Sequence, residues 1–263
     1  MMLPIYQVDA FSDRLFGGNP AAVVLLEKDL PREVLQSVAQ ENNLSETAFV
    51  YLHTSPWRIR WFTPLVEVDL CGHATLAAAH VLFVHRSARK NPLQFKSRSG
   101  CLQVERDGDW LVLDFPVDQL EPVEPTQALV TGLGATPEQL FRGRSDYLAV
   151  FPDEDVVRTL KPDMATLERV EARGIIATAP GNQVDFVSRF FAPRVGVPED
   201  PVTGSAHTSL VPYWARRLGK PRLRARQLSQ RGGDLLCWQE GDRVKIGGRA
   251  VTYLVGEIYL PAC

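Results

Sequence analysis

Two distant segments of the chain carry the same pattern. Residues 62–68 read FTPLVEV and residues 191–197 read FAPRVGV, and each is followed by a glycine that opens a run of small and apolar residues. The match extends backward, because residues 46–64 and 174–193 each contain an apolar segment, a turn and a second alternating segment. Repetition of this many elements in the same order predicts an internal duplication.

The duplication predicts the fold class and the division of the chain. Strands followed by a helix in each copy favour an α+β fold of two pseudo-symmetric lobes, each a sheet or barrel wrapped around a central helix. Residues 119–127 belong to a segment rich in proline and acidic residues, which is typical of a linker. We therefore expect an N-terminal lobe over residues 1–118 and a C-terminal lobe over 128–263, with the last strand free to pack back on the first lobe.

The central helices follow the two glycines. Residues 73–84 are apolar on nearly every side, so a helix beginning at Gly72 should run through the middle of its lobe. The second helix should begin in the same way at Gly204 and run to about Leu218. It contains Pro212, which predicts a kink or a restriction to the early turns.

A short helix should precede the repeated strands in each copy. Asp29 is the expected N-cap of the first, and Asp163 is the expected N-cap of the second. Gly174 is expected to end the second helix.

The amino ends of the two central helices are candidate anion sites. Unpaired backbone N–H groups and the helix dipole favour negative charge there, and a glycine lets a ligand approach closely. Gly72 and Gly204 could thus hold the carboxylate or enolate oxygens of one small molecule between the lobes. The alternative is that both glycines only permit tight turns from strand to helix.

The polar residues near these glycines are not duplicated. Glu46, at the start of a strand, occurs in the first copy alone; His73 is matched by Ser205, and Cys71 by the region of Asp200. Carboxylates and an imidazole in a partly dry site are suited to acid/base chemistry, with proton transfer at carbon as the natural task. Taken singly, the Ser-Glu and Asp-Pro pairs are also typical of ordinary turns and loops.

The roles of two further polar residues remain open. Asn19, in the string GGNP, either shapes a turn or touches the site. His207 either faces the site or makes a local hydrogen bond at the end of its helix.

Composition argues against several classes of partner. A formal net charge of −2 gives no global attraction to nucleic acid or to a membrane surface, and no apolar stretch is long enough to span a bilayer. The amino terminus lacks an export signal and the cysteines lack a disulfide pattern, so we expect a cytoplasmic protein. Cys71, His73 and His80 do not complete a set of metal ligands, and we predict no metal.

Five ordered strings along nearly the whole chain resemble the phenazine-biosynthesis PhzF-like family. They are FGGNPAAVV, LSETAF, FTPLVEVDLCGHATLAAA, EDPVTGSAH and VKIGGRAV. That family shares its fold with diaminopimelate epimerase and proline racemase. The resemblance implies two lobes with an active site between them, a homodimer, and an isomerase that works without cofactor or metal.

The resemblance also implies roles for individual residues. Glu46 would be the catalytic acid/base that moves a proton between carbons of a small unsaturated amino acid. Asp200 and His73 would hold the amino group or other polar substituents. The substrate carboxylate would be held by Gly72, Gly204 and Ser205, with Ser45 nearby.

Two alternatives stay open. The related racemases use a thiol from each lobe; Cys71 stands at the first thiol position, but the second motif offers Asp200, so an amino-acid racemase or epimerase would need Cys71 with a non-thiol partner. A non-catalytic binding protein is the other alternative, because residues 216–231 hold seven basic residues and no acidic one.

Overall fold

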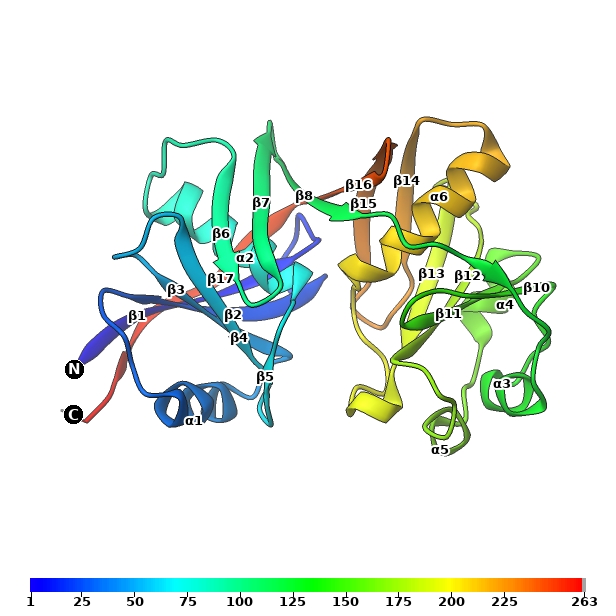
Figure 1. Ribbon diagram of the computed structural model, residues 1–263, viewed down its shortest axis with the longest axis horizontal. Helices are drawn as coiled ribbons and strands as arrows, with labels where there is room; N and C mark the ends of the chain where they lie inside the picture. Colours follow the sequence, from blue (N-terminus) through cyan, green and yellow to red (C-terminus); the bar gives the residue numbers. More distant parts are fainter. Residues whose placement is uncertain (262–263) are drawn as a thin grey trace. The chain divides into compact units, whose positions relative to one another are not determined.

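The computed structural model describes residues 1–261 and divides the chain into two compact units (Figure 1). The first unit consists of Met1–Asp114 together with the chain from Gly247 onward, and the second consists of Phe115–Ile246. Strands β8 and β16 carry the chain across the two boundaries. Both units combine a mixed sheet with a few helices, which confirms the predicted α+β class.

The first unit is built on a mixed sheet. Its strands are β1 (Met2–Ala10), β2 (Asn19–Leu26), β3 (Glu46–Tyr51), β4 (Trp57–Phe62), β5 (Glu67–Val68), β6 (Leu93–Ser97), β7 (Gly100–Asp107), β8 (Trp110–Pro116) and β17 (Ala250–Tyr259). β1 lies antiparallel to both β17 and β2. The pairs β2–β3 and β4–β6 are parallel, whereas β3–β4, β6–β7 and β7–β8 are antiparallel. Its helices are α1 (Arg32–Asn42) and α2 (Gly72–His85).

The second unit repeats this arrangement. Its strands are β9 (Glu121–Pro122), β10 (Gln139–Arg142), β11 (Asp146–Val150), β12 (Gly174–Pro180), β13 (Phe186–Phe191), β14 (Arg222–Gln227), β15 (Gly233–Glu240) and β16 (Arg243–Gly248). Its helices are α3 (Gln127–Leu133), α4 (Glu154–Thr159), α5 (Met164–Leu167) and α6 (His207–Leu218), with 3₁₀ turns η1 (Pro193–Val195) and η2 (Gly204–Ala206). The pairs β11–β12 and β13–β14 are parallel, at the places that β2–β3 and β4–β6 hold in the first unit. The predicted duplication is thus visible in the pairing itself.

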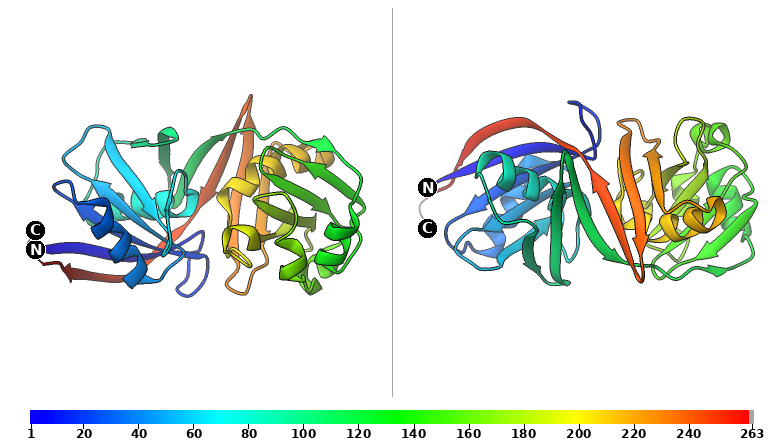
Figure 2. Two further views of the ribbon diagram at one scale, coloured as in Figure 1. Left: turned by 60° about the horizontal axis from the view of Figure 1, so that its bottom comes forward. Right: turned by 90° about the horizontal axis from the view of Figure 1, so that it is seen from above.

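Each unit borrows one strand from the other copy of the repeat. β9 follows the last hairpin of the first copy but pairs with β10 in the second unit. β17 follows the last hairpin of the second copy but pairs with β1 along nearly its whole length in the first unit. Figure 2 shows β1 and β17 side by side, and at the end of this pair the Met1 amine donates to the Leu260 carbonyl at 2.6 Å.

Strands β2 and β3 of the first unit are covered on both faces. One face of β2, β3 and β4 packs on α1 through Leu35, Val38 and Phe49. On the inner side α2 packs against β1, β2, β3, β7 and β17, which confirms that this helix runs inside its lobe. Nine of its residues are buried, from His73 to Leu82. Among residues 1–261 no helix is long and apolar enough to cross a membrane.

Helix α6 continues through Pro212 rather than ending there. Proline has no N–H, so the carbonyl of Thr208, four residues earlier, loses its helical donor. The backbone N–H of Asp118 donates to that carbonyl at 3.2 Å, and Ser209 Oγ donates to the Asp118 carboxylate at 2.9 Å. Asp118, near the start of the second unit, therefore supplies the hydrogen bond that Pro212 removes from the helix.

The predicted helix ends are only partly right. Asp29 does not cap α1, whose N-cap is Pro31 without a side-chain bond; Asp29 instead pairs with Arg58. Asp163 does cap α5, through the amides of Ala165 and Thr166. Gly174 begins β12 instead of ending a helix, because α5 stops after a single turn.

Candidate active site

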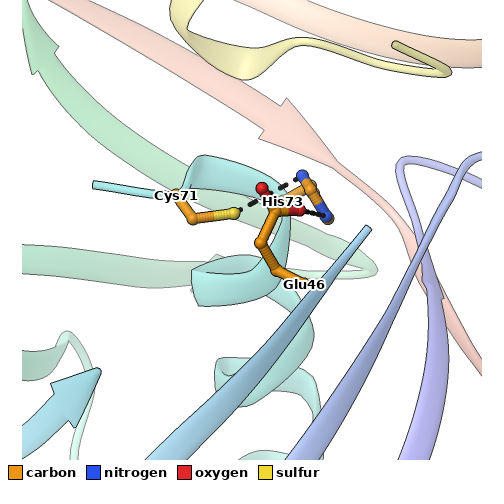
Figure 3. Close-up of side chains that lie close together, drawn as sticks. All are labelled: Glu46, Cys71 and His73. Atoms are coloured by element: carbon orange, nitrogen blue, oxygen red, sulfur yellow. Dashed lines mark hydrogen bonds and ion pairs between the residues drawn. The ribbon is translucent and has the colours of Figure 1, made fainter. Parts of the chain in front are cut away.

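Three side chains of the first unit converge on one point, as Figure 3 shows. His73 Nε2 lies 3.0 Å from Glu46 Oε2, and His73 Nδ1 lies 3.6 Å from Cys71 Sγ. Glu46 is the first residue of β3, directly after Ser45, while Cys71 is the N-cap of α2 and Gly72 its first residue. The start of one strand and the start of the central helix thus bring the imidazole between a carboxylate and a thiol.

Asn19, the first residue of β2, contacts the His73 imidazole at Nδ1. The side-chain amide of Asn19, a fully buried residue, lies 3.2 Å from His73 Nδ1. Gly18 makes this approach feasible, since it has a φ of +63° and a Cβ there would lie 2.1 Å from the Ala10 carbonyl oxygen. Asn19 therefore touches the candidate site, and the adjacent glycines of GGNP were the sequence signal for it.

The charges of the cluster fix its protonation. Burial by itself would lower the pKa of His73, but the polar contact with Cys71 and the negative charge of Glu46 raise it well above its ordinary value. Burial and then Glu46 raise the pKa of the Cys71 thiol, so this sulfur stays protonated near neutral pH. The cluster therefore holds an imidazolium beside a carboxylate. The two groups sit at ion-pair distance without forming an aligned hydrogen bond.

The same three residues can be considered as metal ligands, because their donor atoms lie within 4.8 Å of one another. However, Glu46 and Cys71 face opposite nitrogens of one ring, and an ion can take only one of these nitrogens.

The remaining predicted residues lie together in the second unit. Asp200 Oδ2 accepts a hydrogen bond from Thr203 Oγ1 at 2.5 Å. Buried Gln227 ties this loop down, because its amide donates to the Asp200 carbonyl at 2.7 Å and accepts from the Thr203 N–H at 2.9 Å. Gly204 and Ser205 begin the 3₁₀ turn η2, and α6 starts only at His207. The prediction that the α-helix begins at Gly204 is therefore wrong by one turn.

Ser205 has a partner that the sequence did not suggest. Arg173, the residue directly before β12, donates from Nη1 to Ser205 Oγ at 3.0 Å. An arginine that precedes a strand looks like any surface cation in the sequence, so only the strand pairing reveals this contact.

His207 is a structural residue. Its side chain is fully buried, its Nδ1 lies 2.9 Å from the Thr203 carbonyl, and its Nε2 has no hydrogen-bond partner among the described residues. Burial lowers its pKa from 6.5 to about 4. The local hydrogen bond, one of the two alternatives for this histidine, is the one that the structure contains.

Acid should destabilise the protein through His207. The unfolded chain takes up a proton below about pH 6.5, whereas the folded chain resists it until about pH 4. Stability is therefore full above the unfolded pKa and falls as the pH drops toward 4, by about 3 kcal/mol for this group. Urea unfolding at several pH values should show this loss in the wild type and a shallower slope in His207→Gln. Identical slopes would contradict the assignment.

The basic run of residues 216–231 is shared between the end of α6 and β14. Part of its charge is paired, because Lys220 contacts Asp185 at 2.5 Å and Arg226 contacts Asp234 at 2.7 Å. Arg222 lies over the ring of Trp238. These contacts give the stretch structural partners within its own unit.

Comparison with known proteins shows which family the chain resembles. The family model for phenazine biosynthesis-like proteins, PhzC-PhzF, matches residues 8–256. An uncharacterized isomerase of Pseudomonas aeruginosa is 54% identical over 99% of this chain and 100% of its own length. The crystal structure of a PhzF-family protein from Enterococcus faecalis has a TM-score of 0.96 and 46% identity, and covers 99% of this chain and 100% of that one.

A solved structure of much lower sequence identity has a similar fold. A hydroxyproline epimerase from Agrobacterium vitis, with bound trans-4-hydroxy-L-proline, has a TM-score of 0.61 and 12% identity over 98% of this chain and 92% of that one. This likeness shows that the two proteins share a fold. The family match over residues 8–256, with 54% identity to the Pseudomonas relative, shows that the chain belongs to the phenazine biosynthesis-like (PhzC-PhzF) family.

Proposed function

We propose that this isomerase moves a proton between two carbons of a small carboxylate-bearing metabolite, with Glu46 as acid/base and without cofactor or metal. The observation that supports this most directly is the 3.0 Å contact between the Glu46 carboxylate and the imidazole of the buried His73. Relatives named isomerases agree with the reaction class.

The chemistry of the proposal uses groups that the chain contains. The Glu46 carboxylate takes a proton from one carbon, and the electron pair of that C–H bond shifts into an enolate-like system. Protonated Glu46 then returns the proton to another carbon, so that the double bond has moved and the enzyme is unchanged. The His73 imidazole, 3.0 Å from this carboxylate, pairs with it before the first step and again after the second.

Substrate binding is assigned to the turns that precede α2 in the first unit and α6 in the second. Backbone N–H groups at Gly72 open the fourteen-residue helix α2 and suit a carboxylate. Asp200 would accept hydrogen bonds from an amino group, and Gly204 with Ser205 would bind an oxyanion. Ser45 flanks Glu46 at the start of β3.

Hydrogen exchange with solvent tests the function. The protein is incubated in D₂O with a panel of small amino, hydroxy and unsaturated acids, with and without a metal chelator, and deuterium at carbon is measured by mass spectrometry and NMR. The proposal expects incorporation at carbon for at least one acid, unchanged by the chelator. A panel-wide lack of carbon exchange together with ligand stabilisation in thermal-shift assays would point to a binding protein instead.

Cys71→Ser is expected to keep activity within about threefold of the wild type, because burial keeps the thiol protonated and it is therefore a poor base. A racemase that used Cys71 would instead lose exchange at the α-carbon by about 10²-fold or more. Exchange rates of the variant and the wild type, measured with the same acid, separate the two mechanisms.

We also propose that the two units are the two lobes of each chain, and that two chains form a cytoplasmic homodimer. Each unit has its own central helix and its own set of strands around it, which supports the division into lobes. Light scattering coupled to size exclusion should give twice the mass of the chain. A mass of one chain at all concentrations would exclude the dimer.

A further inference from the structure

Arg173 is held in a fixed orientation by a buried acid. Its Nε donates to Asp146 Oδ1 at 2.9 Å and its Nη2 donates to Oδ2, so both carboxylate oxygens are used. The Asp146 side chain is 5% exposed, whereas that of Arg173 is 40% exposed. The backbone contributes as well, because the Arg173 N–H donates to the Ser145 carbonyl at 2.8 Å. A bidentate pair of this kind defines the plane of the guanidinium.

The Nη1 group of this guanidinium determines the hydrogen-bonding role of the Ser205 hydroxyl. A guanidinium has donors and no acceptor, so in the 3.0 Å contact with Nη1 the Ser205 oxygen must be the acceptor. The single hydroxyl hydrogen of Ser205 then points away from Arg173. Since Ser205 is only partly buried, this hydrogen is directed to an acceptor outside the side-chain pair.

The repeat places this pair next to the positions of the proposed acid/base pair. Ser205 matches His73, and Arg173 directly precedes the strand that matches the one begun by Glu46. In the strand register Ala21 pairs with Glu46 in the first unit and Asp146 with Gly174 in the second, so Arg173 lies one residue before the equivalent of Glu46. The first unit thus has a carboxylate at the start of this strand, and the second unit has a cation directly before it.

We propose that Arg173 is a positioning residue which, held by Asp146, fixes the Ser205 hydroxyl as a hydrogen-bond donor to an oxyanion of the substrate. This inference rests on the proposed function, since it gives the two copies of the repeat different tasks. The first copy moves the proton through Glu46, and the second binds an anionic oxygen through Ser205. Substrates with a carboxylate or another oxyanion are preferred over their uncharged amides for this reason.

Binding of benzoate and of benzamide, a neutral molecule of similar shape, tests the inference by titration calorimetry. Arg173→Gln and Ser205→Ala should each weaken benzoate binding about tenfold, as expected for a hydrogen bond to a charged group. Benzamide binding should change little. The double variant should be no weaker than either single one, because Arg173 acts through Ser205.

Arg173→Lys separates positioning from charge. Lysine keeps the positive charge beside Asp146, but its single nitrogen cannot serve both carboxylate oxygens and Ser205 at once. It should therefore lose benzoate affinity as Arg173→Gln does, with an unchanged urea midpoint as the check on folding. Full recovery by lysine, additive losses in the double variant, or failure of wild-type protein to bind benzoate up to its solubility limit would overturn the inference.

Arg226→Gln provides the matched control, because it also removes an arginine paired with an aspartate of the same unit. Benzoate affinity should be unaffected there. Glu46→Gln should also still bind benzoate. If the wild-type protein exchanged no carbon-bound hydrogen with any acid of the panel but still bound benzoate in an Arg173-dependent way, the proposed function would be rejected and the role of Arg173 would stand.

Discussion

Glu46→Gln is expected to lower kcat by about 10²- to 10⁴-fold, the usual contribution of a general acid/base. Glutamine has the same shape and cannot accept the proton from carbon. It also removes the negative charge that helps to hold the pKa of His73 high, so the imidazole should become neutral at a lower pH than in the wild type. The rate of deuterium incorporation at carbon, with the acid found in the solvent exchange screen, measures the first effect. NMR titration of His73 measures the second.

Glu41→Gln is the matched control for this experiment, because Glu41 is an exposed acid on α1 of the same unit. It should exchange carbon-bound hydrogen at the wild-type rate. Wild-type turnover by Glu46→Gln would reject Glu46 as the acid/base. A lower His73 pKa together with unchanged turnover would show that the cluster is electrostatically coupled but not catalytic.

Trp214→Ala is expected to lower the free energy of unfolding by about 3–5 kcal/mol, a large share of the 5–15 kcal/mol typical of a whole domain. The indole is fully buried, stacks on Phe186 with ring centroids 5.8 Å apart, and donates from Nε1 to Thr178 Oγ1 at 3.0 Å. Truncation leaves a cavity inside the second unit and a buried hydroxyl without its donor. Urea unfolding followed by circular dichroism measures the loss.

Trp238→Ala controls for the loss of an indole as such. Trp238 is half-buried on β15 and donates to Glu240 on the surface, so its removal should cost about 1 kcal/mol or less. Equal losses in the two variants would show that the stack on Phe186 adds nothing. Because α6 follows η2 directly, Trp214→Ala should also weaken benzoate binding at Ser205.

The duplication could be predicted because its pattern is local. Alternating strands, the glycine and the apolar helix recur in the same order, and the structure repeats their pairing down to the two parallel pairs in each unit. The starts of the helices were harder to predict. Asp29 can cap a helix or pair with Arg58, and the position of the strand that carries Arg58 determines which of the two it does. Gly204 was placed one turn too early because a 3₁₀ turn and an α-helical turn have similar sequence preferences.

The candidate site was predictable where its residues stand at the ends of recognisable elements. Glu46 begins β3 and His73 lies in the first turn of α2, and the structure brings both together with Cys71. Arg173 could not be found in the same way. Its significance depends on Asp146, which is distant in sequence and comes close only through the parallel pairing of β11 with β12.

The exchange of β9 and β17 has a consequence for how such a protein could arise. A single copy of the repeat ends in a strand that its own sheet cannot accept, while its first strand, β1 or β10, lacks an outer neighbour. An ancestral half-length polypeptide could therefore complete its sheet only by reciprocal strand donation between two identical molecules. Two separately expressed halves of the chain should therefore reassemble when mixed, because each supplies the other's outer strand.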